Sequence, residues 1–151
     1  MPITGDFNVE GQADTAERDL IIKTMVGEAL GEGLPGMIAV GESIRNRSRA
    51  RKKSPTEIVF QPLQYEFWND TKLAESKLQK MLTPEVYQMA AHAYEEAFHN
   101  GSDTIMGATN YLNPELTIQR AGKLPSWASE DRKVTVVGNH HFFQEQRRTS
   151  K

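Results

Sequence analysis

"KTMVGEALGEGLPGMIAVGESIRNR", residues 23–47, is the stretch that decides the fold of this chain. Apolar residues recur at helical spacing before and within it, from Ile21 to Ala29, which predicts a helix with one buried face that starts near Thr15. The segment "GEGLPG" breaks that helix, and Pro35 is well placed to open a second helix with a basic end. The stretch therefore predicts two helices joined by a short glycine-rich break.

The rest of the chain predicts a further long helix and then a change of period. In "TPEVYQMAAHAYEEAFHNG", Thr83 caps the helix, a proline fills its first turn and Asn-Gly stops it. Residues 55–60 predict a short helical turn before an aromatic loop. "ATNYLNP" and "KVTVVGNHHFF" predict short β segments around a loop with Trp127. We expect an α+β fold, mainly helical, with a small β portion near the C-terminus.

Length and composition indicate one domain. The chain has 151 residues, 38% of them hydrophobic and 25% charged, which suits a single core with a cleft. Residues 1–14 are rich in Gly, Asp and Asn and lack a period, so we expect a flexible N-terminal arm ahead of a single domain at 15–151. The arm has no basic n-region and no apolar h-region, so we expect no secretory signal and synthesis in the cytoplasm.

Charge and cysteine usage exclude several classes. A net charge of -2 gives no global field that would attract nucleic acid. No apolar run reaches the roughly 18 residues of a membrane-spanning helix. The sequence has no cysteine, which excludes disulfides and thiolate metal sites.

Glu28 lies where a carboxylate is unexpected. On a helix it shares the face of Met25, and Glu32 falls on the same face if the helix continues that far. A carboxyl group held against apolar side chains has a raised pKa, which suits a general acid for glycosidic cleavage at neutral pH. The alternative is a frayed, solvated helix end in which the glutamates pair with Lys23 or Arg45.

Glycines surround these carboxylates, at positions 27, 31, 33 and 36. Glycines destabilise a helix, so their presence here indicates another role, such as allowing a chain-like ligand to approach closely. Glu42 also follows a glycine, but it lies off the apolar stripe of the second helix. Because Arg45 and Asn46 follow it by three and four residues, we expect Glu42 to form a structural ion pair.

Two further groups suit a polymeric ligand. The run "RNRSRARKK", residues 45–53, holds six cationic side chains, which suits a phosphate backbone or an anionic wall polymer, or else a solvated helix end. "QYEFWND" and "TNYLNP" set aromatic rings beside amide side chains. That combination suits sugar rings, or else core aromatics flanked by turn residues.

The four histidines do not predict a metal site. His140 and His141 are adjacent on a predicted strand, so their side chains point to opposite faces. His92 and His99 are seven residues apart on a helix and lack a third ligand of suitable spacing. We expect no metal and no cofactor.

Four segments, in order, resemble the cell wall hydrolase family that includes the spore cortex-lytic enzymes and many phage and prophage lysins. "VGEALGEGLPGMIAVGESIRNR" is similar to its Gly-Glu-Ala-x-Gly-Glu stretch, its glycine break and its helix ending in Asn-Arg. "IVFQPLQYEFWND", "ATNYLNP" and "PSWASEDRKVTVVGNHHFF" resemble its aromatic loop, its Tyr-x-Asn-Pro segment and its terminal Trp loop with Gly-x-His-x-Phe. The resemblance runs from about residue 18 to residue 143.

This resemblance implies a lysozyme-like, lytic-transglycosylase-like domain that cleaves the β-1,4 bond between N-acetylmuramic acid and N-acetylglucosamine in peptidoglycan. Glu28 matches the family's catalytic acid and Glu32 a supporting, substrate-binding residue. Leu30 stands where the family often has arginine. A lytic transglycosylase forming 1,6-anhydro ends needs one carboxylate, whereas a hydrolytic muramidase would use a second, for which Glu32, Glu42 and Asp70 are candidates.

The same resemblance sets further expectations. Trp68, Asn69, Tyr111 and Asn113 are expected to line the sugar cleft, with His140 as a secondary candidate. The expected partner is the peptidoglycan glycan strand, bound by a monomer, with no nucleic acid and no stable membrane insertion. We expect no signal and no wall-binding module, which would favour a phage or prophage endolysin that acts on the cell wall after release through a holin.

Two other functions stay open from the sequence. A non-catalytic module that binds the cell wall or nucleic acid would use the basic run 45–53 and would be indifferent to Glu28. An amidase or peptidase acting on the stem peptide would commonly need zinc or a cysteine nucleophile, for which the chain is poorly equipped.

Overall fold

The structure, a computed structural model, describes residues 4–61 and 65–144, with side chains from residue 15 onward. Its elements follow in chain order: α1 (Thr4–Ala29), η1 (Leu30–Glu32), α2 (Gly33–Arg51), α3 (Pro55–Val59), η2 (Glu66–Asn69), α4 (Thr71–Met81), α5 (Pro84–Phe98), β1 (Asn110–Leu112), α6 (Pro114–Ala121), β2 (Lys133–Val137) and β3 (His140–Phe143). This confirms the expected α+β class, mainly helical with a small sheet near the C-terminus. Within the described ranges, no helix combines the length and apolarity needed to cross a membrane.

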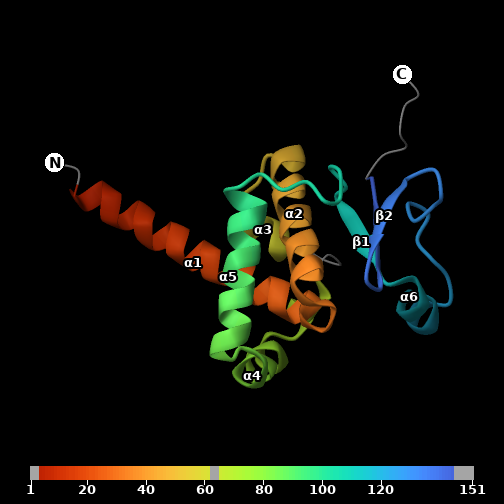
Figure 1. Cartoon of the computed structure of the whole chain (residues 1–151), viewed down its shortest axis with the longest axis horizontal. Coiled ribbons are helices and arrows are strands. Elements are labelled where there is room, and N and C mark those ends of the chain that lie inside the picture. Colours follow the sequence, from red (N-terminus) through yellow and green to blue (C-terminus); the bar gives the residue numbers. More distant parts are fainter. Residues whose placement is uncertain (1–3, 62–64, 145–151) are drawn as a thin grey trace.

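The helical body forms where α1, α2 and α5 pack against one another (Figure 1). Its core contains the apolar stripe predicted for α1, including Ile21, Ile22 and Met25, all of them almost inaccessible to solvent. At Gly41 a Cβ atom would lie 2.9 Å from Met25 Sδ and 3.1 Å from Ala97 Cβ. The glycine therefore allows α2 to approach both of the other helices closely.

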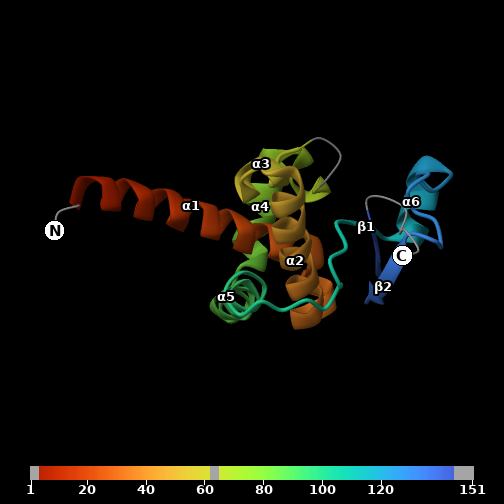
Figure 2. The same ribbon diagram turned by 90° about the horizontal axis from the view of Figure 1, so that it is seen from above.

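A small sheet lies beside this body, on the side away from the N-terminus (Figures 1 and 2). Its three antiparallel strands are ordered β1-β3-β2, and Tyr111 of β1 is paired with Phe142 of β3. A second cluster of Ala39, Ile105, Ala108 and Phe142 joins α2 to the sheet. Burial of Phe142 thus fixes the sheet against the second helix.

The start of α1 differs from the prediction. Residues 4–14, expected to form a flexible arm, continue α1 as helix and project from the helical body (Figure 1). Extending an existing helix adds one hydrogen bond for each residue that is fixed. The glycines of this segment therefore do not end the helix, although they obscure its period in the sequence.

Two helices were not predicted at all. In α4 the structure buries Ala74 and Leu78 only, and α6 buries no residue, so neither helix contributes much to the core. Their end signals are nevertheless present. Asp70 caps α4, and α6 begins after Asn113 and ends at Gly122 in a left-handed conformation. The predictions of α3 and α5 are confirmed, including the cap by Thr83.

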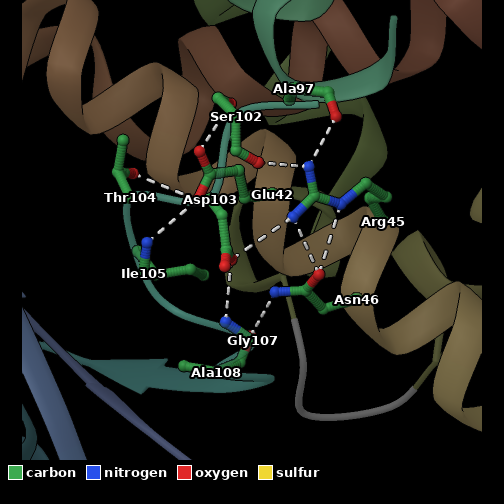
Figure 3. A network of polar contacts seen from close by, with 10 residues as sticks. All are labelled: Glu42, Arg45, Asn46, Ala97, Ser102, Asp103, Thr104, Ile105, Gly107 and Ala108. Carbon is green, nitrogen blue, oxygen red and sulfur yellow. Dashed lines mark hydrogen bonds and ion pairs between the residues drawn. The ribbon is translucent and has the colours of Figure 1, made fainter. Parts of the chain in front are cut away.

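A buried polar network joins α2 to the loop between α5 and β1 (Figure 3). Glu42 is fully buried and accepts hydrogen bonds from the Ser102 hydroxyl (2.6 Å), the Thr104 hydroxyl (3.0 Å) and the Ile105 N–H (3.0 Å). The predicted structural role is thus observed, but loop donors, rather than an ion pair with Arg45, bind the carboxylate directly.

Arg45 and Asn46 hold the same loop at other points (Figure 3). The Arg45 guanidinium donates to the carbonyl groups of Ala97 (2.8 Å) and Ser102 (2.5 Å), and the Asn46 amide donates to the Ala108 carbonyl (2.8 Å). Burial lowers the pKa of Arg45, and the nearby Glu42 charge opposes that effect. The network fixes the route by which the chain enters β1.

Candidate active site

Glu28 is held by three elements that are distant in sequence. It lies in the last turn of α1, one residue before the helix ends. Its Oε1 accepts a hydrogen bond from the Tyr111 hydroxyl of β1 (2.6 Å), and its Oε2 accepts one from the Phe67 N–H of η2 (2.9 Å). The carboxyl group therefore sits where the helical body, the aromatic loop and the sheet meet.

Gly27 allows η2 to come this close. A Cβ atom at that position would lie 2.3 Å from the Phe67 ring, so only glycine leaves room for the ring against α1. The approaching loop brings its Phe67 N–H to Glu28. The sequence predicted that these glycines admit a ligand, whereas at position 27 the space is filled by the protein's own aromatic ring. At Gly31 there is open space, with no atom within 4 Å.

The surroundings of Glu28 favour its protonated form. Burial raises the pKa of this carboxyl group, as the sequence predicted, and the hydrogen bonds from Tyr111 and Phe67 oppose the shift only in part. A charge on His140 also lowers this pKa, and the charge of Glu66 raises it. A carboxyl group that keeps its proton toward neutral pH can act as a general acid.

Tyr111 is fixed by rings on several sides. Its ring centroid lies 4.9 Å from that of His140, 5.3 Å from Phe142 and 5.9 Å from Tyr65. Burial raises the pKa of Tyr111 well above its ordinary value, and the Glu28 charge acts in the same direction. The hydroxyl therefore keeps its proton and donates it in a hydrogen bond to Glu28.

Glu32 points toward the turn between β2 and β3 and the start of β3. Its Oε1 lies 2.6 Å from His140 Nδ1, and its Oε2 accepts from the Asn139 N–H (3.1 Å). Both glutamates were expected to share one helix face if the first helix continued as far as Glu32, and that condition is not met because α1 ends at Ala29 and the chain continues as the 3-10 helix η1. The change of helix type rotates Glu32 out of the predicted phase.

The other predicted cleft residues have different surroundings. Trp68 donates from its indole nitrogen to Thr24 Oγ1 (2.9 Å), and its ring meets that of Phe67 edge to face. Asn69 is exposed at the end of η2, next to that pair. The Asn113 side chain accepts from the Leu116 N–H and caps α6. Of these four candidates, Tyr111 makes the direct contact with Glu28.

The three carboxylates expected to be available for a second catalytic role are all engaged. Glu32 binds His140, Glu42 binds the loop after α5, and Asp70 accepts from the Leu73 N–H as the cap of α4. Sequence reasoning missed Glu66, whose charge acts on Glu28. Neither its spacing nor its neighbours in the sequence mark it, because its approach to α1 depends on the fold of η2.

The basic run 45–53 is not one exposed surface. Arg45 and Arg47 are buried, and Arg47 donates to the Thr109 carbonyl while its guanidinium lies 5.0 Å from the centre of the Tyr65 ring. Arg49, Lys52 and Lys53 are exposed at the end of α2. The first part of the run is therefore a structural support of the site, which removes two cations from the predicted binding surface.

A family model supports the resemblance noted in the sequence. The model of the cell wall hydrolase family matches residues 31–143, more than half of the chain, and the chain belongs to this family. The matched region includes Tyr111 and His140, and it begins three residues after Glu28. A spore cortex-lytic enzyme of Halalkalibacterium halodurans is 28% identical over 137 residues, covering 89% of this chain and 37% of that protein. The chain thus spans little more than a third of this relative's length.

Two solved structures share the fold. The catalytic domain of the germination-specific lytic transglycosylase SleB from Bacillus anthracis superposes with a TM-score of 0.62 at 22% identity, covering 85% of this chain and 93% of that one. The catalytic domain of the Bacillus cereus SleB protein gives a TM-score of 0.64 at 22% identity, covering 85% and 89%. The predicted lytic-transglycosylase-like fold is confirmed.

Proposed function

Because the chain belongs to the cell wall hydrolase family, we propose that it cleaves peptidoglycan at the β-1,4 bond between N-acetylmuramic acid and N-acetylglucosamine, as a lytic transglycosylase. Glu28 is the general acid and base. The observation that carries this proposal is the surroundings of Glu28, a partly buried carboxyl group with a raised pKa that is held by one hydroxyl and one backbone N–H. The names of the related proteins support the substrate class.

Protonated Glu28 starts the reaction by donating its proton to the glycosidic oxygen as the bond from that oxygen to the muramic C1 breaks. The carboxylate that results takes the proton of the muramic 6-hydroxyl, whose oxygen then bonds to C1. A 1,6-anhydro ring forms, no water is consumed, and Glu28 ends protonated as it began. Tyr111 and Phe67 donate hydrogen bonds that strengthen when Glu28 becomes charged, so they stabilise the intermediate state.

Glycan strands are the proposed partner of this site. Trp68, Asn69 and Asn113 remain proposed substrate-binding residues, because Trp68 and Asn69 belong to η2 and Asn113 directly follows β1, the two elements that contact Glu28. The partly buried Trp68 ring and the exposed Asn69 amide offer an apolar face and a hydrogen-bonding group, which sugar rings require. A phage or prophage lysin role with release through a holin remains a prediction of the sequence.

A hydrolytic muramidase is the second candidate, and Glu66 is the observation that favours it. Its charge raises the pKa of Glu28, so the two carboxyl groups are near enough for their charges to interact. Retaining hydrolysis needs two carboxyl groups about 5–5.5 Å apart, and inverting hydrolysis about 6.5–9.5 Å. However, Glu66 is largely exposed, and its carboxylate forms an ion pair with Arg120 at 2.8 Å. Because this carboxylate already has a partner, we favour transglycosylation over hydrolysis.

Mass spectrometry of digested peptidoglycan tests this proposal. Purified peptidoglycan is treated with the wild type, Glu28→Gln, Glu66→Gln and Glu95→Gln, the last being a control on a partly exposed carboxylate of α5. We expect muropeptides one water lighter than the hydrated species from the wild type, the Glu66 variant and the control, and none from the Glu28 variant. Reducing muramic ends that disappear with Glu66→Gln would instead establish the muramidase. Intact glycan with the wild type would contradict both.

A further inference from the structure

We propose that Glu32 and His140 act together as a positioning pair, which fixes the Tyr111 ring and thereby the direction of the Glu28 carboxyl group. This inference rests on the proposed function of Glu28. It gives Glu32 and His140 a task other than contacting the sugar, because their hydrogen-bonding groups already face each other across two parts of the fold. The pair links η1 to the first residue of β3.

The Glu32 carboxylate has its position fixed on several sides. It binds His140 Nδ1 at 2.6 Å and the Asn139 N–H at 3.1 Å, and both side chains of the pair are 13% exposed. Two glycines make room for it. A Cβ atom on Gly36 would lie 2.6 Å from Glu32 Cβ, and one on Gly138 would lie 2.8 Å from Glu32 Cδ. The carboxylate therefore occupies a niche that side chains at either position would fill.

His140 transmits this position to Tyr111. A hydrogen bond of 2.6 Å joins Nδ1 of His140 to Oε1 of Glu32. This bond fixes the imidazole plane, which stands at 84° to the Tyr111 ring with the centroids 4.9 Å apart. Phe142 packs on the same tyrosine. The ring therefore has little freedom to turn its hydroxyl away from Glu28.

His140 also connects the pair to the acidity of the site. The titratable groups that face it are Glu32 from η1, Tyr111 from β1 and Glu28 from α1, and the charge of His140 also acts on its strand neighbour His141. A positive charge on His140 lowers the pKa of Glu28, against the dominant effect of burial. Replacing His140 by a neutral residue therefore raises the pKa of Glu28 and moves the alkaline limb of the pH–rate profile to higher pH.

The matched control is a second pair of the same chemistry. On α5, His99 Nδ1 lies 2.7 Å from Glu95 Oε1, and both side chains are about half exposed. It resembles the Glu32–His140 pair in residue types, atoms and distance, but it contacts no part of the Glu28 site. His99→Gln and Glu95→Gln therefore report what losing a histidine–glutamate pair does by itself.

Steady-state kinetics on soluble glycan strands over a range of pH, with melting temperatures, test the positioning pair. For His140→Gln we expect kcat to fall by about tenfold to 10²-fold, the size of effect that misplacement of a catalytic group produces, with KM little changed. The alkaline limb should move to higher pH. Glu32→Gln should lower kcat by a smaller factor, because its amide oxygen still accepts from His140. His99→Gln and Glu95→Gln should match the wild type.

Two outcomes would overturn the inference. One is a folded His140→Gln variant whose kcat and pH profile equal those of the wild type, while Glu28→Gln is inactive. In that case the proposed function stands and the positioning pair does not. The other concerns the wild type and applies even if the variants fail to fold. In an NMR titration of His140, Tyr111 signals that do not respond to its protonation would contradict the proposal.

Discussion

Glu28 and Glu42 each follow a glycine on a helix, and the fold gives them opposite surroundings. Glu42 is fully buried, binds three loop donors and lies near the Arg45 guanidinium. Glu28 binds two donors, and no guanidinium or ammonium group contributes to the shift of its pKa. The difference teaches that the Gly-Glu pattern alone does not identify an acid. What matters is which partners the fold brings to each carboxyl group.

Removing the Glu28 carboxyl group should have the largest effect on activity. Glu28→Gln keeps the size of the side chain but cannot donate the proton, so we expect the rate of glycan cleavage to fall by about 10²- to 10⁴-fold. Glu42→Gln should cleave glycan at a rate close to that of the wild type, measured at a temperature where the variant is folded. Release of soluble muropeptides measures both. Equal losses of cleavage rate in the two variants would contradict the assignment of different roles to Glu28 and Glu42.

Gly27→Ala tests whether the close approach of η2 builds the acid's surroundings. The added Cβ atom would overlap the Phe67 ring, so the ring and its N–H must move away from Glu28. Displacement of a catalytic contact of this kind lowers rates by about 10²-fold. Gly31→Ala, in open space near Glu28, is the control for loss of a glycine. The cleavage rates of both variants test this expectation. A fully active Gly27→Ala variant would show that the close approach of η2 is not needed for catalysis.

Stability should respond in opposite directions at the two glutamates. Glu42→Gln leaves loop donors poorly satisfied, and we expect a loss of about 1–3 kcal/mol in the free energy of unfolding. Glu28→Gln should melt at the same temperature as the wild type or higher near neutral pH.

The sign at Glu28 follows from linkage. Its pKa is raised in the folded state, so its contribution to stability is fully present below the unfolded pKa and is lost as pH rises through the folded pKa. The advantage of Glu28→Gln should therefore shrink as pH falls. Thermal melts from acid to neutral pH measure this, and a Glu28→Gln variant that melts lower at every pH would refute it.

Tyr111→Phe sharpens the account of how the acid is tuned. The Tyr111 hydroxyl lowers the pKa of Glu28, so its removal raises that pKa further. Since Glu28 must be protonated to act, activity is lost at high pH, and the alkaline limb should move upward. We expect kcat to fall about tenfold or more, because a donor to the charged carboxylate is lost. The pH–rate profile measures the position of the alkaline limb. A shift of that limb to lower pH would be inconsistent with a hydrogen bond from Tyr111 to the ionised Glu28.

The smallest effect is expected at the exposed pair between Arg120 and Glu66. Their side chains are 61% and 64% exposed, and exposed pairs contribute about 0–1 kcal/mol. Arg120→Ala should change the unfolding free energy by less than about 1 kcal/mol and leave the cleavage products the same. Denaturant unfolding checks the first point. A change of product to reducing ends would point to Glu66 as a second carboxylate.

Local patterns predicted what is local in this molecule. Periodicity and capping residues gave α2, α3, α5 and the β segments, and helical phase gave Glu28 its apolar surroundings. The helical phase does not extend to Glu32, because α1 ends at Ala29, next to the predicted glycine-rich break, and a 3-10 helix follows. The two long-range contacts of Glu28, with Phe67 and Tyr111, join residues 39 and 83 positions away and depend on the whole fold.

The titration of Glu28 itself tests the central claim most directly. Carbon-13 NMR of side-chain carboxyl groups, with Glu28→Gln to assign the signal, reports its pKa in the folded protein. The account predicts a value above that of an ordinary glutamate, moving higher still in Tyr111→Phe. A Glu28 carboxyl group that titrates at or below the ordinary value would contradict the account, because it would be ionised at neutral pH and could not be the proton donor.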